Sequence, residues 1–219
     1  MADEERVESY ICSLGNNMSD VLRSIEKESL EDEVPIIRKE SQTFLEFLMY
    51  DHKPERILEV GTATGFSASF MWESVKNATH GKAPKITTIE KYEKRIPIAK
   101  NNFARMGADK DIVLLEGDAA DILKNLQGNF DFVFMDAAKA QYINYLPDVT
   151  RLLVPGGILL TDNVLRDGDI CESRYAVTRR NRTIHTRVRE YLYELTHNDL
   201  YKTTILNIAD GMALSLRKV

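Results

Sequence analysis

The sequence predicts an α/β fold built on a mostly parallel seven-stranded sheet, with helices on both faces and an antiparallel closing strand. Five short apolar runs alternate with helical segments between residues 56 and 163, which is typical of buried parallel strands joined by crossover helices. Two further strand-like runs end the chain, where an antiparallel pair is expected. A length of 219 residues suits one domain with a sizeable core.

This single predicted domain, residues 1–219, has two parts. Residues 1–50 should form N-terminal helices. Residues 51–219 should form the sheet with its covering helices, and they include a basic segment at 166–189. We find no internal repeat and no low-complexity tract that would indicate a second unit.

The individual elements follow from local apolar patterns. Residues 1–33 are acidic with apolar side chains at helical spacing, and a second helix is expected over 34–50, after Pro35. The five central strands are expected at RILEV (56–60), KITTIE (85–90), DIVLLEGD (111–118), FDFVFMD (130–136) and GGILLTDN (156–163). Further helices are expected at 67–76 and 94–107, and the closing strand pair at YKTTILNI (201–208) and GMALSLRK (211–218).

In sheets of this kind, ligands bind outside the carboxyl ends of the strands. The first strand ends in EVGTATGFS (59–67), a glycine turn that lets a ligand approach the backbone and the next helix N-terminus. The spacing from Gly61 to Gly65, with Ala63 between them, departs from the GxGxxG pattern of dinucleotide sites, and the lysine of a P-loop is missing. NAD, FAD and nucleoside triphosphates are therefore disfavoured.

Acidic residues stand near the ends of the neighbouring strands. Glu59 precedes the glycine turn, and Glu90 ends the second strand, where a carboxylate can accept hydrogen bonds from both ribose hydroxyls. For Glu90 alone, an exposed strand-end acid is an equally good interpretation. Together the two acids indicate a ligand with a ribose and positive charge, and S-adenosylmethionine fits. Asp118 and Ala119, after the third strand, would lie near its adenine.

Three oxygen-bearing side chains end the next two strands. Asp136 ends the fourth strand, and Asp162 and Asn163 end the fifth. Such ligands suit Mg²⁺ or another divalent cation such as Ca²⁺, whereas a lone aspartate at a strand end is more often a helix cap. Lys139, three residues after Asp136, is then a candidate general base, the alternative being a solvated surface lysine.

Composition bears on the cellular location that is expected for the protein. No apolar run reaches membrane-spanning length and the N-terminus lacks the apolar region of a signal peptide, so a cytoplasmic protein with no membrane partner is expected. Cys12 and Cys171 are far apart and predict neither a disulfide framework nor a zinc site.

Several motifs together carry a family resemblance: EVGTATGFS, TTIEKYEKR, FVFMDAAK, LVPGGILLTDNVL and IADGMALSLRK. They resemble the Mg²⁺-dependent class I O-methyltransferases, which include catechol and caffeoyl-CoA O-methyltransferases, from about Pro35 to the C-terminus. The resemblance implies a Rossmann-like methyltransferase fold and methyl transfer from S-adenosylmethionine to an acceptor oxygen. A homodimer is a family-level expectation.

The same resemblance implies a set of site residues. S-adenosylmethionine is expected at Ile37, Glu59, Gly61, Thr62, Ala63, Phe66, Ser67, Glu90, Ala119 and Asp136. The metal is expected at Asp136, Asp162 and Asn163, and the catalytic lysine is expected to be Lys139.

One stretch stands out by its charge. RYAVTRRNRTIHTRVR (174–189) holds six arginines and no acidic residue, in a chain of net charge −5. From Ile184 onward the apolar residues follow helical spacing. Arginine suits bidentate contact with phosphate, and Tyr175 could stack on a base. The arginines expected to contact RNA are Arg174, Arg179, Arg180 and Arg182.

The basic stretch resembles the bacterial tRNA 5-hydroxyuridine methyltransferases of the same family. This resemblance implies that the partner is the tRNA anticodon loop. The enzyme would methylate the 5-hydroxyl of the wobble 5-hydroxyuridine, which gives 5-methoxyuridine. Two alternatives stay open. One is a small-molecule catechol or phenol O-methyltransferase, caffeoyl-CoA-like and using the same metal. The other is a non-catalytic RNA-binding module, against which the intact metal and lysine set speaks.

Overall fold

The computed structural model describes residues 4–15 and 18–219, so the parts of the first predicted helix at 1–3 and 16–17 lie outside the described residues. The N-terminal helices are α1 (Glu4–Ser13), α2 (Asp20–Glu31) and α3 (Lys39–His52). The core then runs through β1 (Arg56–Val60), α4 (Phe66–Ala78), β2 (Lys85–Glu90), α5 (Ile96–Arg105), β3 (Ile112–Glu116), α6 (Ala119–Asn125), β4 (Phe130–Met135), α7 (Tyr142–Leu152) and β5 (Leu153–Thr161). It ends with α8 (Arg182–His197), β6 (Tyr201–Leu206) and β7 (Met212–Arg217), and two short 3₁₀ turns lie at η1 (Lys139–Gln141) and η2 (Arg166–Cys171).

The strands form one seven-stranded sheet in the order β3-β2-β1-β4-β5-β7-β6. The first five strands pair in parallel, and β7 pairs antiparallel with both β5 and β6. This confirms the predicted fold class. The chain order reverses between β1 and β4, and ligands of open α/β sheets bind at such a reversal.

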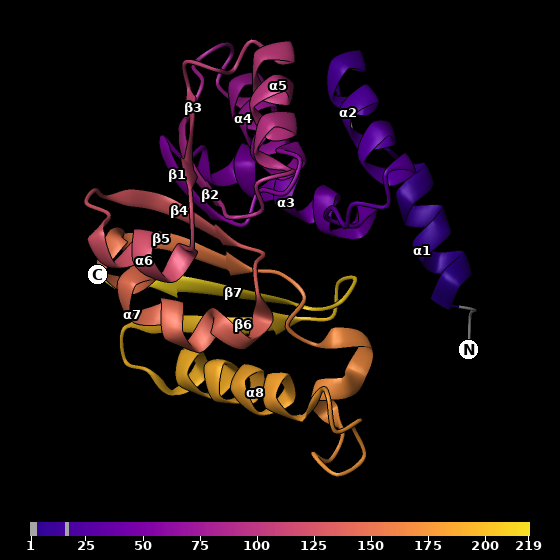
Figure 1. Cartoon of the computed structure of the whole chain (residues 1–219), viewed down its shortest axis with the longest axis vertical. Helices are drawn as coiled ribbons and strands as arrows, with labels where there is room; N and C mark the ends of the chain where they lie inside the picture. Colours follow the sequence, from indigo (N-terminus) through magenta and orange to yellow (C-terminus); the bar gives the residue numbers. More distant parts are fainter. Residues whose placement is uncertain (1–3, 16–17) are drawn as a thin grey trace.

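Apolar residues on both sides of the strands account for the two helical layers. In β1, Ile57 packs into the core shared with α2, α3, α4 and α5, whereas Leu58 and Val60 pack into the core shared with α6, α7 and α8. Figure 1 shows these two groups of helices on opposite faces of the sheet. The helix α1 packs against α3, outside both layers.

Two predictions need correction. The helix expected over 34–50 begins at Lys39, and residues 34–38 are not helical. Pro35 disfavours the helical region for the residue before it, and the helix starts only after Arg38 in extended conformation. The last parallel strand, expected from Gly156, begins at Leu153. The closing pair is confirmed within one or two residues at each end.

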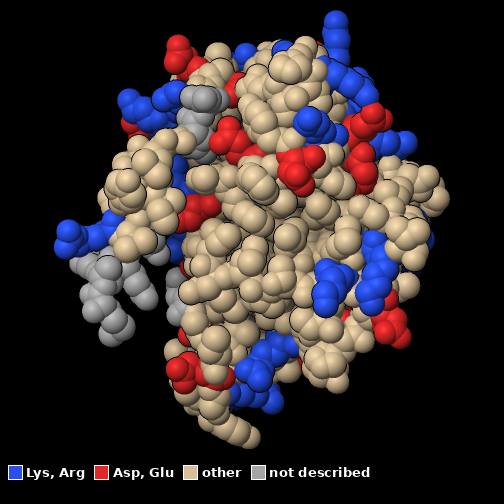
Figure 2. All heavy atoms as spheres, turned by 180° about the vertical axis from the view of Figure 1, so that it is seen from behind, with Lys and Arg blue, Asp and Glu red and all other residues tan. Residues whose placement is uncertain are grey.

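Charged side chains are unevenly distributed over the surface. On the face seen from behind Figure 1, lysine, arginine and acidic residues lie mostly around the rim, and the centre is largely uncharged (Figure 2). Within the described part of the chain, none of the helices combines the length and the apolar character that crossing a bilayer would require.

Candidate active site

A cavity of about 610 Å³ opens at the carboxyl ends of β1, β2, β4 and β5, where the sequence placed the chemistry. Residues 34–38, between α2 and α3, form one wall of it. The predicted site residues that line the cavity are Ile37, Gly61, Thr62, Ala63, Phe66, Ser67, Glu90, Ala119, Asp136, Lys139, Asp162 and Asn163. The structure thus brings together cofactor, metal and lysine candidates from six separate segments.

The glycine turn after β1 needs its glycines for different reasons. A Cβ on Gly61 would lie 2.3 Å from the backbone oxygen of Asp136, and a Cβ on Gly65 would lie 2.6 Å from the ring of Phe103. Both glycines have positive φ, and so does Ala63 between them, at 49°. The turn therefore lets β1 and β4 approach closely at the cavity floor and delivers the N-terminus of α4 to the cavity.

Glu90, at the end of β2, holds the glycine turn through a hydrogen bond to Ala63. Its Oε2 accepts a hydrogen bond from the Ala63 backbone N–H at 2.9 Å, and its Oε1 accepts from the N–H groups of Lys91 and Tyr92 at 2.8 and 2.7 Å. A carboxylate oxygen has room for more than one donor, so Glu90 can hold the loop and still accept ribose hydroxyls. Its place on the cavity wall supports the predicted role.

Two predicted cofactor residues do not reach the cavity. Glu59 is fully buried behind the turn, where Ser67 Oγ donates to it at 2.5 Å and Thr88 Oγ1 donates to its other oxygen. Burial raises the pKa of Glu59 to about 7, against the effect of these hydrogen bonds. Asp118 caps α6 by accepting from the Ala120 N–H at 2.9 Å. Glu59 therefore supports the turn through Ser67, and Asp118 orders α6.

Asp136 and Asp162 line the cavity where the adjacent strands β4 and β5 end. Although Asp136 keeps some solvent exposure, burial raises its pKa to about 6, opposed by Lys139 and reinforced by Asp210. Burial also raises the pKa of Asp162 to about 7, and the neighbouring Asp136 adds to this. Mutually repelling, desolvated carboxylates are a natural place for a cation, because its charge would favour their ionised forms.

The donor set fits a hard divalent cation. Asn163, with a left-handed backbone at φ 58°, adds an amide beside the two aspartates. Among residues 4–15 and 18–219, no group of three or more His, Cys, Asp or Glu side chains has metal-binding geometry, so any site here depends on Asn163 as third ligand. Oxygen-only ligands suit Mg²⁺, Mn²⁺ or Ca²⁺.

One further acid belongs to this end of the cavity and was not predicted. Asp210, in the turn between β6 and β7, accepts a hydrogen bond from Asn163 Nδ2 at 3.2 Å and pairs with Arg38 Nη2 at 3.0 Å. With its nitrogen held by Asp210, Asn163 has its amide oxygen left for a cation. The motif IADG contains Asp210, but only the folded hairpin shows that it reaches the site.

Lys139 begins the short turn η1 and lines the cavity, and its positive charge partly opposes the rise that burial causes in the pKa values of Asp136 and Asp162. A half-buried lysine among these acids is placed to exchange a proton with an acceptor in the cavity.

The predicted RNA-contacting arginines lie outside the cavity. Arg174, Arg179 and Arg180 are exposed in the loop before α8, which stands out from the body in Figure 1. Tyr175 is 83% exposed, and the guanidinium of Arg182 lies 5.9 Å from the centre of its ring. Two other arginines of the stretch are structural: Arg187 donates to the Ala140 carbonyl and Arg189 donates to the Ile170 carbonyl.

The sequence pattern of one family, described as O-methyltransferase, matches residues 4–218. The chain belongs to the O-methyltransferase family. A catechol O-methyltransferase of Niastella koreensis is 29% identical, and the alignment covers 98% of this chain and 97% of that protein. The structure of a candidate caffeoyl-CoA O-methyltransferase from Staphylococcus aureus is 30% identical, covers 95% of this chain and 98% of its own, and superimposes with a TM-score of 0.85.

A third relative identifies the kind of ligand that this fold binds. An S-adenosylhomocysteine-bound methyltransferase of Podospora anserina is 25% identical, covers 100% of this chain and 97% of its own, and has a TM-score of 0.85. The chain is accordingly an S-adenosylmethionine-dependent O-methyltransferase of the catechol and caffeoyl-CoA type.

Proposed function

We propose that this O-methyltransferase is cation-dependent and methylates one hydroxyl of a small aromatic diol of the catechol type. The observation that carries this proposal is the convergence of Asp136, Asp162 and Asn163 at one end of the cofactor cavity, with Lys139 on the same wall. Full-length similarity to a bacterial catechol O-methyltransferase supports the acceptor class.

Different residues of the cavity would bind the cofactor, bind the cation and accept the proton. S-adenosylmethionine supplies the methyl group, and a divalent cation would bind neighbouring oxygens of the acceptor and make its hydroxyl more acidic. Glu90 and the turn at Gly61 hold and orient the cofactor. Asp136, Asp162 and Asn163 would hold the cation, and Lys139 Nζ, when unprotonated, accepts the proton of the acceptor hydroxyl. Fixing donor and acceptor in line supplies much of the rate.

The proposal is tested by comparing acceptors that differ in one hydroxyl. Purified protein with S-adenosylmethionine and Mg²⁺ should methylate catechol much faster than phenol, as measured by mass spectrometry of the products. EDTA should abolish the activity, and excess Mg²⁺ should restore it. Equal rates for catechol and phenol that EDTA leaves unchanged would rule out the proposal.

A second candidate acceptor is 5-hydroxyuridine at the wobble position of tRNA, which presents two neighbouring oxygens to the same site. It is favoured by the exposed arginines Arg174, Arg179 and Arg180 and by Tyr175, which lie outside the cavity where only a large acceptor would contact them. The partner would then be the anticodon loop, whose single-stranded bases can be splayed into a pocket, and the enzyme would work in the cytoplasm.

The two acceptors are separated by one double variant. Arg179→Ala with Arg180→Ala should reduce transfer of labelled methyl to tRNA bearing 5-hydroxyuridine and leave catechol methylation unchanged. Because phosphate contacts release counterions, the tRNA reaction should also weaken steeply with salt. If wild-type protein labels catechol and leaves this tRNA unlabelled at low salt, the tRNA candidate is eliminated.

A homodimer is the oligomeric state that we propose. The helix α1 exposes Val7, Tyr10 and Ile11, and Leu14 directly after it is exposed as well, with Tyr10 and Leu14 at 66% and 68% exposure. An apolar stripe of this kind is typical of a protein contact surface. Light scattering on the eluting protein should give twice the chain mass of 25.0 kDa, and a mass of one chain would contradict the proposal.

A further inference from the structure

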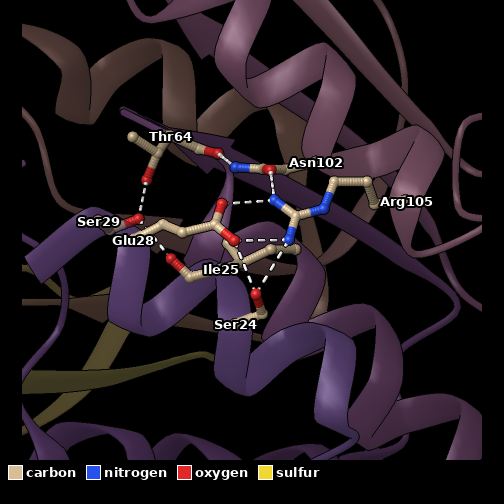
Figure 3. Close-up of polar contacts among 7 residues, drawn as sticks. All are labelled: Ser24, Ile25, Glu28, Ser29, Thr64, Asn102 and Arg105. Atoms are coloured by element: carbon tan, nitrogen blue, oxygen red, sulfur yellow. Dashed lines mark hydrogen bonds and ion pairs between the residues drawn. The ribbon is translucent and has the colours of Figure 1, made fainter. Parts of the chain in front are cut away.

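Thr64 lies in the cofactor turn but faces away from the cavity. Its neighbours Thr62 and Ala63 line the cavity, whereas Thr64 is not among the lining residues, is buried and is hydrogen-bonded from two helices. Its hydroxyl shares a hydrogen bond of 2.8 Å with the hydroxyl of Ser29 in α2, and its carbonyl accepts from Asn102 Nδ2 in α5 at 2.8 Å (Figure 3). The turn is thus held from behind by side chains outside the cavity.

An ion pair holds Asn102 in this orientation. Arg105 Nη1 donates to Asn102 Oδ1 at 3.0 Å, so the amide nitrogen is left to face Thr64. The guanidinium also forms a bidentate pair with Glu28 of α2, at 2.6 and 2.7 Å (Figure 3). The pKa of Glu28 is lowered to about 2, first of all by its hydrogen bond to Arg105, so the pair is charged at neutral pH.

The helix α2 also leads directly into the cavity wall. The carbonyl of Ser29 accepts from the Val34 N–H at 2.9 Å, and residues 34–38 that follow line the cavity. Ser29 therefore contacts two parts of the site. Its side chain is hydrogen-bonded to the cofactor turn, and its backbone carbonyl is hydrogen-bonded to the segment 34–38. The cofactor turn and the wall formed by residues 34–38 are therefore both hydrogen-bonded to α2.

We propose that Ser29, Glu28 and Arg105 are positioning residues for the cofactor, which set the conformation of the turn at 61–65 through Thr64. The turn contains Ala63 at positive φ, a conformation that persists only where the surroundings determine it. The Glu90 bond to Ala63 supplies one constraint from the cavity side, and the α2–α5 network supplies the other. This inference rests on the cofactor of the O-methyltransferase and is independent of its acceptor.

Calorimetric titration with S-adenosylhomocysteine tests it on the full chain. Glu28→Gln and Ser29→Ala should each raise the Kd by about three- to tenfold, the effect of one lost hydrogen bond on the bound state. The matched control is Glu55→Gln, which breaks a surface ion pair between Glu55 and Lys82, neither of which lines the cavity. It should leave the Kd within about twofold of the wild type. In turnover, the KM for S-adenosylmethionine should rise in the two variants with kcat nearly unchanged.

A double-mutant cycle tests whether Glu28 affects cofactor binding through Arg105 and Asn102. If Glu28 acts through Arg105 and Asn102, Glu28→Gln should change the Kd little in an Asn102→Ala background. Additive effects would overturn the proposed route. Hydrogen exchange of the 61–65 turn should be faster in unliganded Glu28→Gln than in Glu55→Gln. If wild type binds S-adenosylhomocysteine and both variants bind it equally well, the network only stabilises the fold and the inference fails. If wild type itself does not bind, the cofactor assignment fails instead.

Discussion

At the scale of single residues, the sequence shows which polar side chains stand at the strand ends. It does not show which of these side chains point into the cavity. Asp136, Asp162, Asn163 and Lys139 line the cavity as their positions predict. Glu59 follows the same reasoning yet lies behind the turn, because Ser67 and Thr88 bind both of its oxygens. Which strand-end acid faces a ligand depends on packing partners from other segments, and a single sequence does not show these.

Lys139 is the residue whose replacement should separate chemistry from binding. Lys139→Met keeps the length of the side chain and removes its proton-accepting nitrogen, so kcat should fall by about 10²- to 10⁴-fold. The Kd for S-adenosylhomocysteine, measured by calorimetry, should stay within about twofold. Lys82→Met, at an exposed site away from the cavity, is the control. Unchanged kcat in Lys139→Met would remove the lysine from the mechanism.

Glu59 makes stability depend on pH. Its pKa rises from 4.5 to about 7 on folding, so the folded protein keeps a proton that the unfolded chain has released across that range. Stability therefore falls as pH rises from 4.5 to 7, and Glu59→Gln is free of this loss. Urea unfolding at about pH 4.5 and pH 8 should show the variant gaining on the order of 1–3 kcal/mol relative to wild type. A difference that stays constant with pH would contradict the raised pKa.

At the scale of elements, apolar runs predict strands better than helix boundaries. The expected strands RILEV and KITTIE coincide with β1 and β2. The sequence pattern does not predict the helices α6 and α7. The former has only 7 residues and the latter contains Pro147, so both lack the long uninterrupted periodicity that identifies a helix from sequence. Their places on the sheet come from tertiary packing.

Replacing Gly61 in the glycine turn should cost more stability than replacing a glycine at an open site. Gly61→Ala would place a Cβ against the Asp136 carbonyl, whereas Gly156→Ala, at a similar positive φ, would meet open space. Backbone strain alone costs roughly 1 kcal/mol, and Gly61→Ala should exceed Gly156→Ala by a further 1–3 kcal/mol, roughly the cost of overpacking. Only Gly61→Ala should weaken S-adenosylhomocysteine binding. Urea unfolding and calorimetry measure both effects, and equal losses in the two variants would contradict the close approach.

At the scale of the whole molecule, the site is shared between the sheet and the N-terminal helices. Residues 34–38 line the cavity, where the family resemblance expects Ile37, and Ser29 of α2 shares a hydrogen bond with the cofactor turn, which the sequence does not indicate. Acceptor choice depends on the surface around the opening, where the basic loop before α8 is exposed. Composition revealed that loop, but its relation to the cavity depends on how α8 packs against η1.

The most direct test of the central claim is Mn²⁺ binding followed by electron paramagnetic resonance, on protein saturated with S-adenosylhomocysteine. Wild type should bind one Mn²⁺ per chain, and Mg²⁺ should displace it. Asp162→Ala should lose this binding while its affinity for S-adenosylhomocysteine stays within about threefold, because Asp162 is a proposed cation ligand and is not among the residues expected to bind the cofactor. Catechol methylation by the same proteins, assayed separately with S-adenosylmethionine in place of S-adenosylhomocysteine, should track cation binding. Wild-type protein that methylates catechol without binding a cation, or an Asp162→Ala variant that binds Mn²⁺ as tightly as wild type, would contradict the account.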